Sequence, residues 1–405
     1  MLGGIAATAL IGALASPSGA GAGCPLPILC QPVPGEPGED PEAAPDPGGD
    51  ESTPVAVPPP GGKRFGVHQT LWETGRYELG AERTAQIARN AGANALRFGL
   101  DWRSVEPVRD AWSERSWARY ERMYRALVDR GMTPLITIGF PPTWAREPGF
   151  AQLCVTARGC EYPPAPSMYA EWEEFAAEVT LRFPAAAIEI WNEPNLDNYW
   201  KPRPEPERYA ALVARAAAAI EAVNPGAPVI GGSLSPAAAT VTGPLGRPAV
   251  LSVRDFLRRA YAASPSLAGR LDALSLHTSF QERDYGADTL FAEAFENLRE
   301  IRDRGGDVGL PIWITESGIS VTGPNAVSRA QQAEGLERQY RRLLTMPDVD
   351  ALFIHTLFDR YEVGPRDPER GYGISEAADP FVPRPAYCVF AEAAGTPAAE
   401  SGCPR

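Results

Sequence analysis

Two glutamates stand at positions where a pair of carboxyl groups could do acid–base and nucleophilic chemistry. Glu193 lies in the segment 188–195, IEIWNEPN, and Glu316 lies in 312–318, IWITESG. Each follows a short apolar run that reads as a buried strand. Two carboxyl groups on opposite walls of one cleft suit the cleavage of a glycosidic bond, since one protonates the leaving oxygen and the other attacks the anomeric carbon or activates water. Taken singly, Glu193 could be a surface acid and Glu316 a helix cap.

Polar residues that could support such a pair end other apolar runs. Arg97 could orient a carboxylate and lower its pKa, since a guanidinium donates hydrogen bonds in a rigid fork, or it could form a structural ion pair. His68 and His277 could contact a bound sugar, because a histidine in a cleft is the usual neutral-pH donor, or they could be satisfied core residues. Glu189 lies in mid-strand and lacks the proline that follows Glu193, so we assign it no role.

Two tryptophans are candidate platforms for a sugar ring. Trp144 and Trp200 follow apolar runs, and aromatic faces at such positions can stack on sugar C–H groups. Both side chains could equally pack in the core.

The chain from residue 63 onward alternates short apolar runs with amphipathic segments. The apolar runs predict strands over 64–67, 95–98, 135–138, 187–191, 229–231, 273–276, 312–315 and 351–355. Segments with helical periodicity lie near 80–92, 117–130, 167–182, 206–223, 252–262, 288–304, 327–344 and 385–394. This α/β alternation predicts a parallel, helix-covered sheet, and eight units are the number that closes a (β/α)8 TIM barrel. A barrel would gather the candidate residues, because barrel active sites lie at the carboxyl ends of the strands.

An open doubly wound sheet is the alternative fold. It predicts a glycine-rich phosphate loop after the first strand, but residues 67–72 read VHQTLW and contain no Gly-x-Gly-x-x-Gly. The barrel is therefore the favoured fold class, as a catalytic domain spanning 63–405.

The charge balance of the chain excludes some classes of partner. Its 405 residues include 38 Lys and Arg against 51 Asp and Glu, a formal net charge of −13. This excess of acid excludes a general phosphate-backbone binder, so no nucleic-acid partner is expected. No run of 18 apolar residues occurs after the first 15, which excludes an internal membrane span. The three histidines lack metal-site spacing and no Cys-x-x-Cys occurs, so we expect no metal and no cofactor.

The first 62 residues differ in composition from the rest. Residues 5–15 form a short apolar run followed by small residues, so 1–23 is predicted to be a signal peptide; a disordered Ala/Gly-rich terminus is the alternative. Residues 24–62 hold 12 prolines, seven acids and no base, which predicts a disordered, extended linker. We therefore expect a secreted or cell-surface protein. A lipoprotein anchor at Cys24 is not favoured, because the usual large aliphatic residue three places before it is absent.

Six cysteines fit an oxidising compartment. An even count in an exported chain suggests disulfides, although sequence alone leaves 15 connectivities. Proximity in the sequence favours three pairs: Cys24 with Cys30, Cys154 with Cys160, and Cys388 with Cys403.

The strings around the two glutamates resemble the clan of retaining β-glycosidases built on (β/α)8 barrels, which includes glycoside hydrolase families 5 and 39. In that clan an Asn-Glu pair ends strand 4 and a Glu ends strand 7. The resemblance implies that Glu193 is the acid/base and Glu316 the nucleophile. It also implies that Asn192 hydrogen-bonds the sugar 2-hydroxyl and that Arg97 keeps the nucleophile ionised. The likeness covers nearly all of 63–395.

Some details tilt the resemblance toward family 39. Residues 140–145, FPPTWA, resemble the Pro-x-Trp loop of that group. The chain departs from the clan where many members have a tyrosine after strand 6, a place that His277 or Tyr285 would take. The strand-8 tryptophan that floors the sugar site is also absent, and Phe358 or His355 would replace it.

These residues together predict a secreted retaining glycoside hydrolase that cleaves β-glycosidic bonds of an oligo- or polysaccharide through a glycosyl-enzyme. The chain is expected to act as a monomer on a carbohydrate substrate. A carbohydrate-binding barrel without catalysis is an alternative from another class, although it would need neither glutamate. A transglycosylase is a further alternative, which would use the same residues and pass the sugar to another sugar.

Overall fold

The computed structural model describes residues 62–70, 80–150, 161–243, 246–264, 267, 269–278, 289–361, 363–376 and 381–404 of the chain. The predicted signal peptide and all of the predicted linker except Gly62 lie outside the described residues. So do Tyr285 and four of the six cysteines, namely Cys24, Cys30, Cys154 and Cys160.

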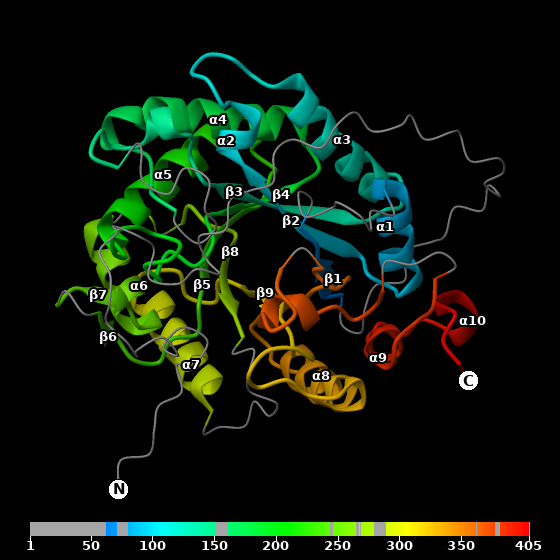
Figure 1. Ribbon diagram of the computed structural model, residues 1–405. Coiled ribbons are helices and arrows are strands. Elements are labelled where there is room, and N and C mark those ends of the chain that lie inside the picture. Colours follow the sequence, from blue (N-terminus) through cyan, green and yellow to red (C-terminus); the bar gives the residue numbers. More distant parts are fainter. Residues whose placement is uncertain are drawn as a thin grey trace, which may run out of the picture.

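Eight parallel strands close into a barrel (Figure 1). In space they run in the order β1-β10-β9-β8-β5-β4-β3-β2, and β2 pairs back to β1. The barrel strands are β1 (Arg64–His68), β2 (Ala95–Asp101), β3 (Thr133–Gly139), β4 (Ala187–Ile190), β5 (Val229–Leu234), β8 (Ala273–His277), β9 (Ile312–Ser317) and β10 (Val349–His355). Every apolar run that was expected to form a strand does so, and the predicted (β/α)8 TIM barrel is confirmed. The doubly wound alternative is excluded, because this sheet closes on itself.

Helices surround the barrel as an outer ring (Figure 1). One long helix follows each barrel strand: α1 (Gly80–Asn90), α3 (Glu114–Val128), α4 (Tyr169–Arg182), α5 (Pro206–Val223), α6 (Val253–Ala263), α7 (Leu290–Arg304), α8 (Arg329–Leu344) and α9 (Pro385–Ala393). The sequence supplies their caps, since the side chains of Ser113, Ser252 and Ser328 accept backbone N–H groups in the first turns of α3, α6 and α8. Among the described helices, none combines the length and apolarity that crossing a bilayer requires.

Several short elements lie between these units. They are α2 (Trp102–Val105), α10 (Ala398–Ser401), the antiparallel pair β6 (Val241–Thr242) and β7 (Pro248–Val250), and 3₁₀ helices at Thr143–Ala145, Pro166–Met168 and Pro368–Gly371. Elements of two to four residues are too short to show hydrophobic periodicity, so the sequence pattern does not predict them.

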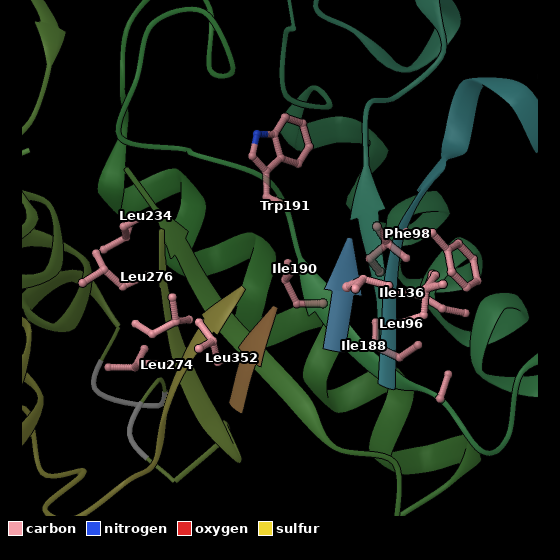
Figure 2. Close-up of a cluster of buried hydrophobic side chains, with 14 of the residues drawn as sticks. Leu96, Phe98, Ile136, Ile188, Ile190, Trp191, Leu234, Leu274, Leu276 and Leu352 are labelled. Carbon is pink, nitrogen blue, oxygen red and sulfur yellow. The ribbon is translucent and has the colours of Figure 1, made fainter. Parts of the chain in front are cut away.

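The pleat of the strands separates an outer core from the barrel interior. Outward-facing residues such as Leu96, Ile136 and Ile188 pack in the main core beneath the helices (Figure 2). The alternate residues point inward, because side chains change face at every residue of a strand. A second apolar cluster there forms the floor of the barrel, made of Ala95, Leu135, Ala187, Ile230, Ala273, Trp313, Ala351 and Phe353.

Polar residues stand one pleat step above this floor. Arg97, Thr137 and Glu189 each lie two residues beyond a floor residue of β2, β3 and β4, and so share its inner face. His68 and His355 end β1 and β10 and are paired in register with each other. The strand period thus places a polar layer directly above an apolar one at the carboxyl ends of the strands.

Gly66 makes room for one residue of the floor. A Cβ at this position would lie 2.7 Å from the carbonyl oxygen of Ala95 and 2.8 Å from the ring of Phe353. Because Gly66 has no side chain, the Phe353 ring can fill the barrel interior beside β1.

A disulfide fastens the C-terminal segment to α9. Cys388 in α9 bonds to Cys403, with 5.6 Å between their Cα atoms. This confirms one of the three expected pairs; the other two lie outside the described residues. The helix packs against α8, and its Phe390 stacks on Phe65 of β1 with ring centroids 4.1 Å apart. The bond therefore holds the helix that covers the junction between the first and last strands.

Removing this disulfide should lower stability while keeping the fold. The double variant Cys388→Ala/Cys403→Ala releases two residues that are 15 apart in sequence, a loop for which the chain-entropy model gives about 3 kcal/mol. We expect the free energy of unfolding in urea to fall by about 2–4 kcal/mol, with unchanged far-UV circular dichroism. A variant with the wild-type unfolding midpoint would show that the bond contributes nothing.

Candidate active site

Arg97 lies at the centre of the polar layer. Its side chain is only 2% exposed. Its guanidinium donates to four acceptors: Glu189 Oε2 (2.8 Å), Glu316 Oε1 (2.5 Å), Asn192 Oδ1 (2.9 Å) and Ser233 Oγ (3.3 Å). One rigid fork thereby fixes side chains from β4, β5 and β9.

Glu189 anchors Arg97 from within the barrel. It is fully buried and also accepts hydrogen bonds from Thr137 Oγ1 (2.7 Å) and Ser275 Oγ (2.8 Å). A buried carboxylate persists when donors satisfy its oxygens, and here the donors come from β2, β3 and β8. Glu189, to which the sequence pattern assigns no role, is thus the residue that positions Arg97 for its contact with Glu316.

Glu316 is surrounded by cationic and imidazole groups. The Nδ1 atoms of His68, His355 and His277 lie 3.5, 3.4 and 3.8 Å from its carboxylate oxygens. Burial alone would raise the pKa of Glu316, but His277, His355, Arg97 and His68 outweigh burial and hold that pKa well below its ordinary value of 4.5. Glu316 is therefore ionised at neutral pH, the form in which a carboxylate can act as a nucleophile.

His277 links the two glutamates. Its Nδ1 lies 3.1 Å from Glu193 Oε1 and 3.8 Å from Glu316 Oε2, and its Nε2 lies 3.0 Å from Ser233 Oγ. The register that pairs His277 of β8 with Glu316 of β9 produces this contact. Burial would lower the pKa of His277, but the carboxylates of Glu316 and Glu193 raise it above its ordinary value. The imidazole of His277 therefore contacts both carboxyl groups and holds them near each other.

The turn after β4 presents Glu193 in a strained backbone. Trp191 and Glu193 have φ angles of 74° and 45°, and Ser233 of β5 has a φ of 47°. This left-handed region is unfavourable for bulky residues and persists only where the surroundings impose it. Here the backbone N–H of Glu193 donates to Ser233 O (2.9 Å), and Trp191 Nε1 donates to Tyr199 O (2.7 Å). Strain concentrated at neighbouring strand ends indicates a functional site.

A further polar group lies where the first and last strands meet. His68 Nδ1 and His355 Nδ1 are 2.8 Å apart, and His355 Nε2 is 3.3 Å from Glu369 Oε2. Arg360 Nη1 donates to the same Glu369 oxygen at 2.8 Å. Burial lowers the pKa of His68 well below its ordinary value, an effect that nearby Glu316 only partly offsets. His68 is therefore uncharged at neutral pH.

His68, Glu316 and His355 could also serve as metal ligands. One ligand atom from each lies within 4.8 Å of the others, and no second group of this kind occurs among the described residues. The expectation of no metal site rested on the spacing of the histidines in the sequence. That spacing carries no information here, because barrel closure brings β1, β9 and β10 together.

The two predicted sugar platforms differ in exposure. Trp144 is partly exposed, and its Nε1 donates to the carbonyl oxygen of Glu106 at 3.1 Å. Trp200 is fully buried between Trp191 and Tyr209, with ring centroids 5.0 and 5.9 Å away. The prediction that Trp200 is a platform is therefore wrong, because packing beneath α5 leaves its ring no face for a ligand.

The structure describes three of the four residues that were expected to replace the tyrosine and tryptophan of the clan, namely His277, His355 and Phe358. His277 occupies the end of β8 and touches Glu193, whereas Tyr285 lies outside the described residues. His355 ends β10 beside Glu316. Phe358 is 6% exposed and packs in the main core, so the prediction that it contacts substrate is corrected.

Some residues of the site were missed from the sequence. Burial, with the nearby carboxylates of Glu193, Glu369 and Glu316, raises the pKa of Tyr199 well above its ordinary value, so its hydroxyl remains a hydrogen-bond donor. Tyr199 closely follows the Asn-Glu-Pro string, where its ring could be read from the sequence as packing or as a face for a sugar. Glu369 stands 14 residues beyond His355 in the 3₁₀ helix Pro368–Gly371, which is too short for a sequence pattern to mark it.

Solved structures of glycoside hydrolases have a similar barrel, although no family model matches the sequence. A family 39 glycoside hydrolase from the gut symbiont Bacteroides cellulosilyticus WH2 is 20% identical, with a TM-score of 0.58, over 82% of this chain and 64% of that one. GH5_18 from Streptomyces cattleya, in complex with GlcNAc, is 17% identical, with a TM-score of 0.60, over 85% and 82% of the two chains. A monomeric beta-xylosidase from Caulobacter crescentus CB15 is 20% identical, with a TM-score of 0.56, over 83% and 69%.

These similarities show a glycoside hydrolase fold of the kind found in families 5 and 39, as the sequence motifs led us to expect. The chain spans 64% of the length of the family 39 enzyme. Because the identities are low, the comparisons establish the fold, and the chemistry has to be argued from the site.

Arg97→Ala should be strongly destabilising, because it leaves two buried carboxylates, Glu189 and Glu316, without their guanidinium. We expect the free energy of unfolding, measured by urea denaturation, to fall by about 3–5 kcal/mol. Arg341→Ala is the matched control, since Arg341 pairs with Glu337 on α8 and its side chain is 74% exposed. Loss of such an exposed pair should leave the free energy of unfolding close to the wild-type value. Equal losses in the two variants would contradict the role given to Arg97.

Proposed function

We propose that the chain is a retaining glycoside hydrolase that cleaves β-glycosidic bonds of an oligo- or polysaccharide by double displacement. The observation that carries this proposal is the placement of Glu193 and Glu316 around His277. Retaining enzymes hold their carboxyl groups about 5–5.5 Å apart and inverting enzymes about 6.5–9.5 Å apart. His277 Nδ1 lies 3.1 Å from Glu193 Oε1 and 3.8 Å from Glu316 Oε2, and this proximity supports the shorter, retaining separation.

In the first step, protonated Glu193 donates its proton to the glycosidic oxygen while Glu316 attacks the anomeric carbon. The bond to the leaving sugar breaks, and a glycosyl ester forms on Glu316. Arg97 already binds Glu316 Oε1, so Oε2 is the oxygen that attacks. The fixed guanidinium keeps this carboxylate ionised and aimed without moving during the reaction.

In the second step, ionised Glu193 takes a proton from water, which attacks the anomeric carbon and releases the sugar with its configuration retained. His277 Nδ1 lies 3.1 Å from Glu193 Oε1 and orients this carboxyl group in both steps. Asn192 accepts a hydrogen bond from Arg97 through Oδ1, which leaves its amide N–H groups to donate to a sugar hydroxyl.

The similar structures support a carbohydrate ligand. Their names include a beta-xylosidase and an enzyme in complex with GlcNAc. The partly exposed ring of Trp144 is the remaining candidate for stacking on the sugar.

Chemical rescue with azide tests the two roles separately. Glu316→Ala should reduce hydrolysis of an activated aryl β-glycoside by at least about 10³-fold, because no glycosyl ester can form. Added azide should restore turnover and give the α-glycosyl azide. In Glu193→Ala the ester still forms from an activated substrate, so azide should give the β-glycosyl azide. Products are identified by NMR.

The control for this experiment is Glu337→Ala, which removes an exposed carboxylate of α8 and should keep wild-type turnover. Full activity in Glu316→Gln, or a single azide anomer from both variants, would refute the assignment of nucleophile and acid/base.

We further propose that this enzyme is exported, with residues 1–23 as the signal peptide and 24–62 as a spacer. The apolar run of 5–15 supports export, and so does the disulfide of the C-terminal segment, because disulfides persist in oxidising compartments. N-terminal sequencing of the protein recovered from the culture medium of an expressing bacterium should find a start between residues 16 and 24. Recovery only inside the cell, with Met1 intact, would contradict export.

A further inference from the structure

We propose that His68, His355 and Glu316 form a binding site for a divalent transition-metal ion such as Zn²⁺. The two Nδ1 atoms lie 2.8 Å apart, and they lie 3.5 and 3.4 Å from Glu316 Oε1 and Oε2, respectively. A tetrahedral Zn²⁺ with nitrogen and oxygen ligands at about 2.0–2.2 Å spaces those ligands by about 3.3–3.6 Å. To admit the ion, the imidazole pair has to open by about half an ångström and the carboxylate has to turn one oxygen toward both nitrogens.

The group behind His355 suits this role. Metal-binding histidines almost always donate their other ring N–H to a carboxylate, which fixes the tautomer and turns the remaining lone pair toward the ion. His355 Nε2 faces Glu369 Oε2 at 3.3 Å, and Arg360 holds that carboxylate from the other side. The Nδ1 lone pair of His355 therefore points toward His68 and Glu316. His68 offers its own Nδ1 when its proton resides on Nε2.

The ligand atoms and the nearby charges indicate which kind of metal ion the site would bind. Two imidazoles and one carboxylate suit zinc, copper or nickel, whereas magnesium and calcium require oxygen ligands. Three protein ligands leave a fourth position for water. The ligand Glu316 and the carboxylate of Glu369 behind His355 both supply negative charge beside a bound dication.

Occupancy of this site would switch the proposed hydrolase off, a consequence that rests on the proposed function. The ion would take the carboxylate that otherwise attacks the anomeric carbon, so metal and sugar would compete for Glu316. Metal binding itself does not depend on hydrolysis and can be measured without a substrate.

Calorimetric titration of the chelator-treated full-length protein with Zn²⁺ tests the site directly, and the visible absorption of bound Co²⁺ reports its coordination. We expect one ion per chain, with affinity lower by at least about 100-fold in His68→Asn and in His355→Asn. Glu369→Gln, which keeps all three ligands, should weaken binding by about 10–100-fold. Mg²⁺ and Ca²⁺ should give no saturable signal.

His277→Asn is the matched control, because His277 also approaches Glu316, at 3.8 Å, but is not part of the group. It should bind Zn²⁺ as tightly as the wild type. Absence of saturable Zn²⁺ binding to the wild type, or an equal loss in His277→Asn and His68→Asn, would overturn the proposed site.

Inhibition separates this proposal from the proposed function. Zn²⁺ should inhibit hydrolysis in competition with the substrate, and a chelator should reverse the inhibition. The residual turnover of His355→Asn should be insensitive to Zn²⁺. Binding of Zn²⁺ to a protein without hydrolase activity would retain the metal site and reject the hydrolase. If Zn²⁺ neither binds measurably nor changes the rate of hydrolysis, the hydrolase would be retained and the metal site rejected.

Discussion

A guanidinium removed from water has to be neutralised by anions within reach, and Arg97 imposes this requirement on the centre of the barrel. Glu189 meets it from one side and Glu316 from the other. Each of these carboxylates has further partners on other strands, so the position of one cation is transmitted to most of the polar layer. Asn192 joins the same fork. Arg97, Glu189 and Glu316 are therefore held in place by barrel strands and a buried charge network.

The strand pleat explains how a polar network can exist in so apolar a fold. A residue two positions along a strand returns to the same face, so Arg97, Thr137 and Glu189 rise above the apolar floor without interrupting the outer core. The pairing departs from this regular step between β5 and β8, between β8 and β9, and between β9 and β10. The pairing of β5 with β8 shifts after Gly231, and the pairing of β8 with β9 shifts before Glu316. Such bulges turn side chains toward a new face, and here they accompany Ser233 and Glu316, which both contact Arg97.

Periodicity predicted the elements of this fold well, because eight strand–helix units repeat the same apolar pattern. The two glutamate strings then located the site, since strand ends in a barrel converge. What periodicity could not show is which residues meet across the barrel. Glu189 reads as a misplaced charge in a strand until Arg97 is seen beside it. Trp200 has the same local pattern as an exposed aromatic, and only the packing against Trp191 and Tyr209 shows that it is core.

The junction between β1 and β10 has a consequence for folding during synthesis of the chain. His68 and His355 lie 287 residues apart in the sequence, yet they face each other at the junction of β1 and β10. A growing chain that has made every strand but the last can hold Arg97 against Glu189, but it lacks one wall of the cleft. The site comes into being only when synthesis of β10 is finished and the long loop closure it requires has been achieved. A product that ends before β10 therefore cannot close the barrel, because β10 joins β1 to β9.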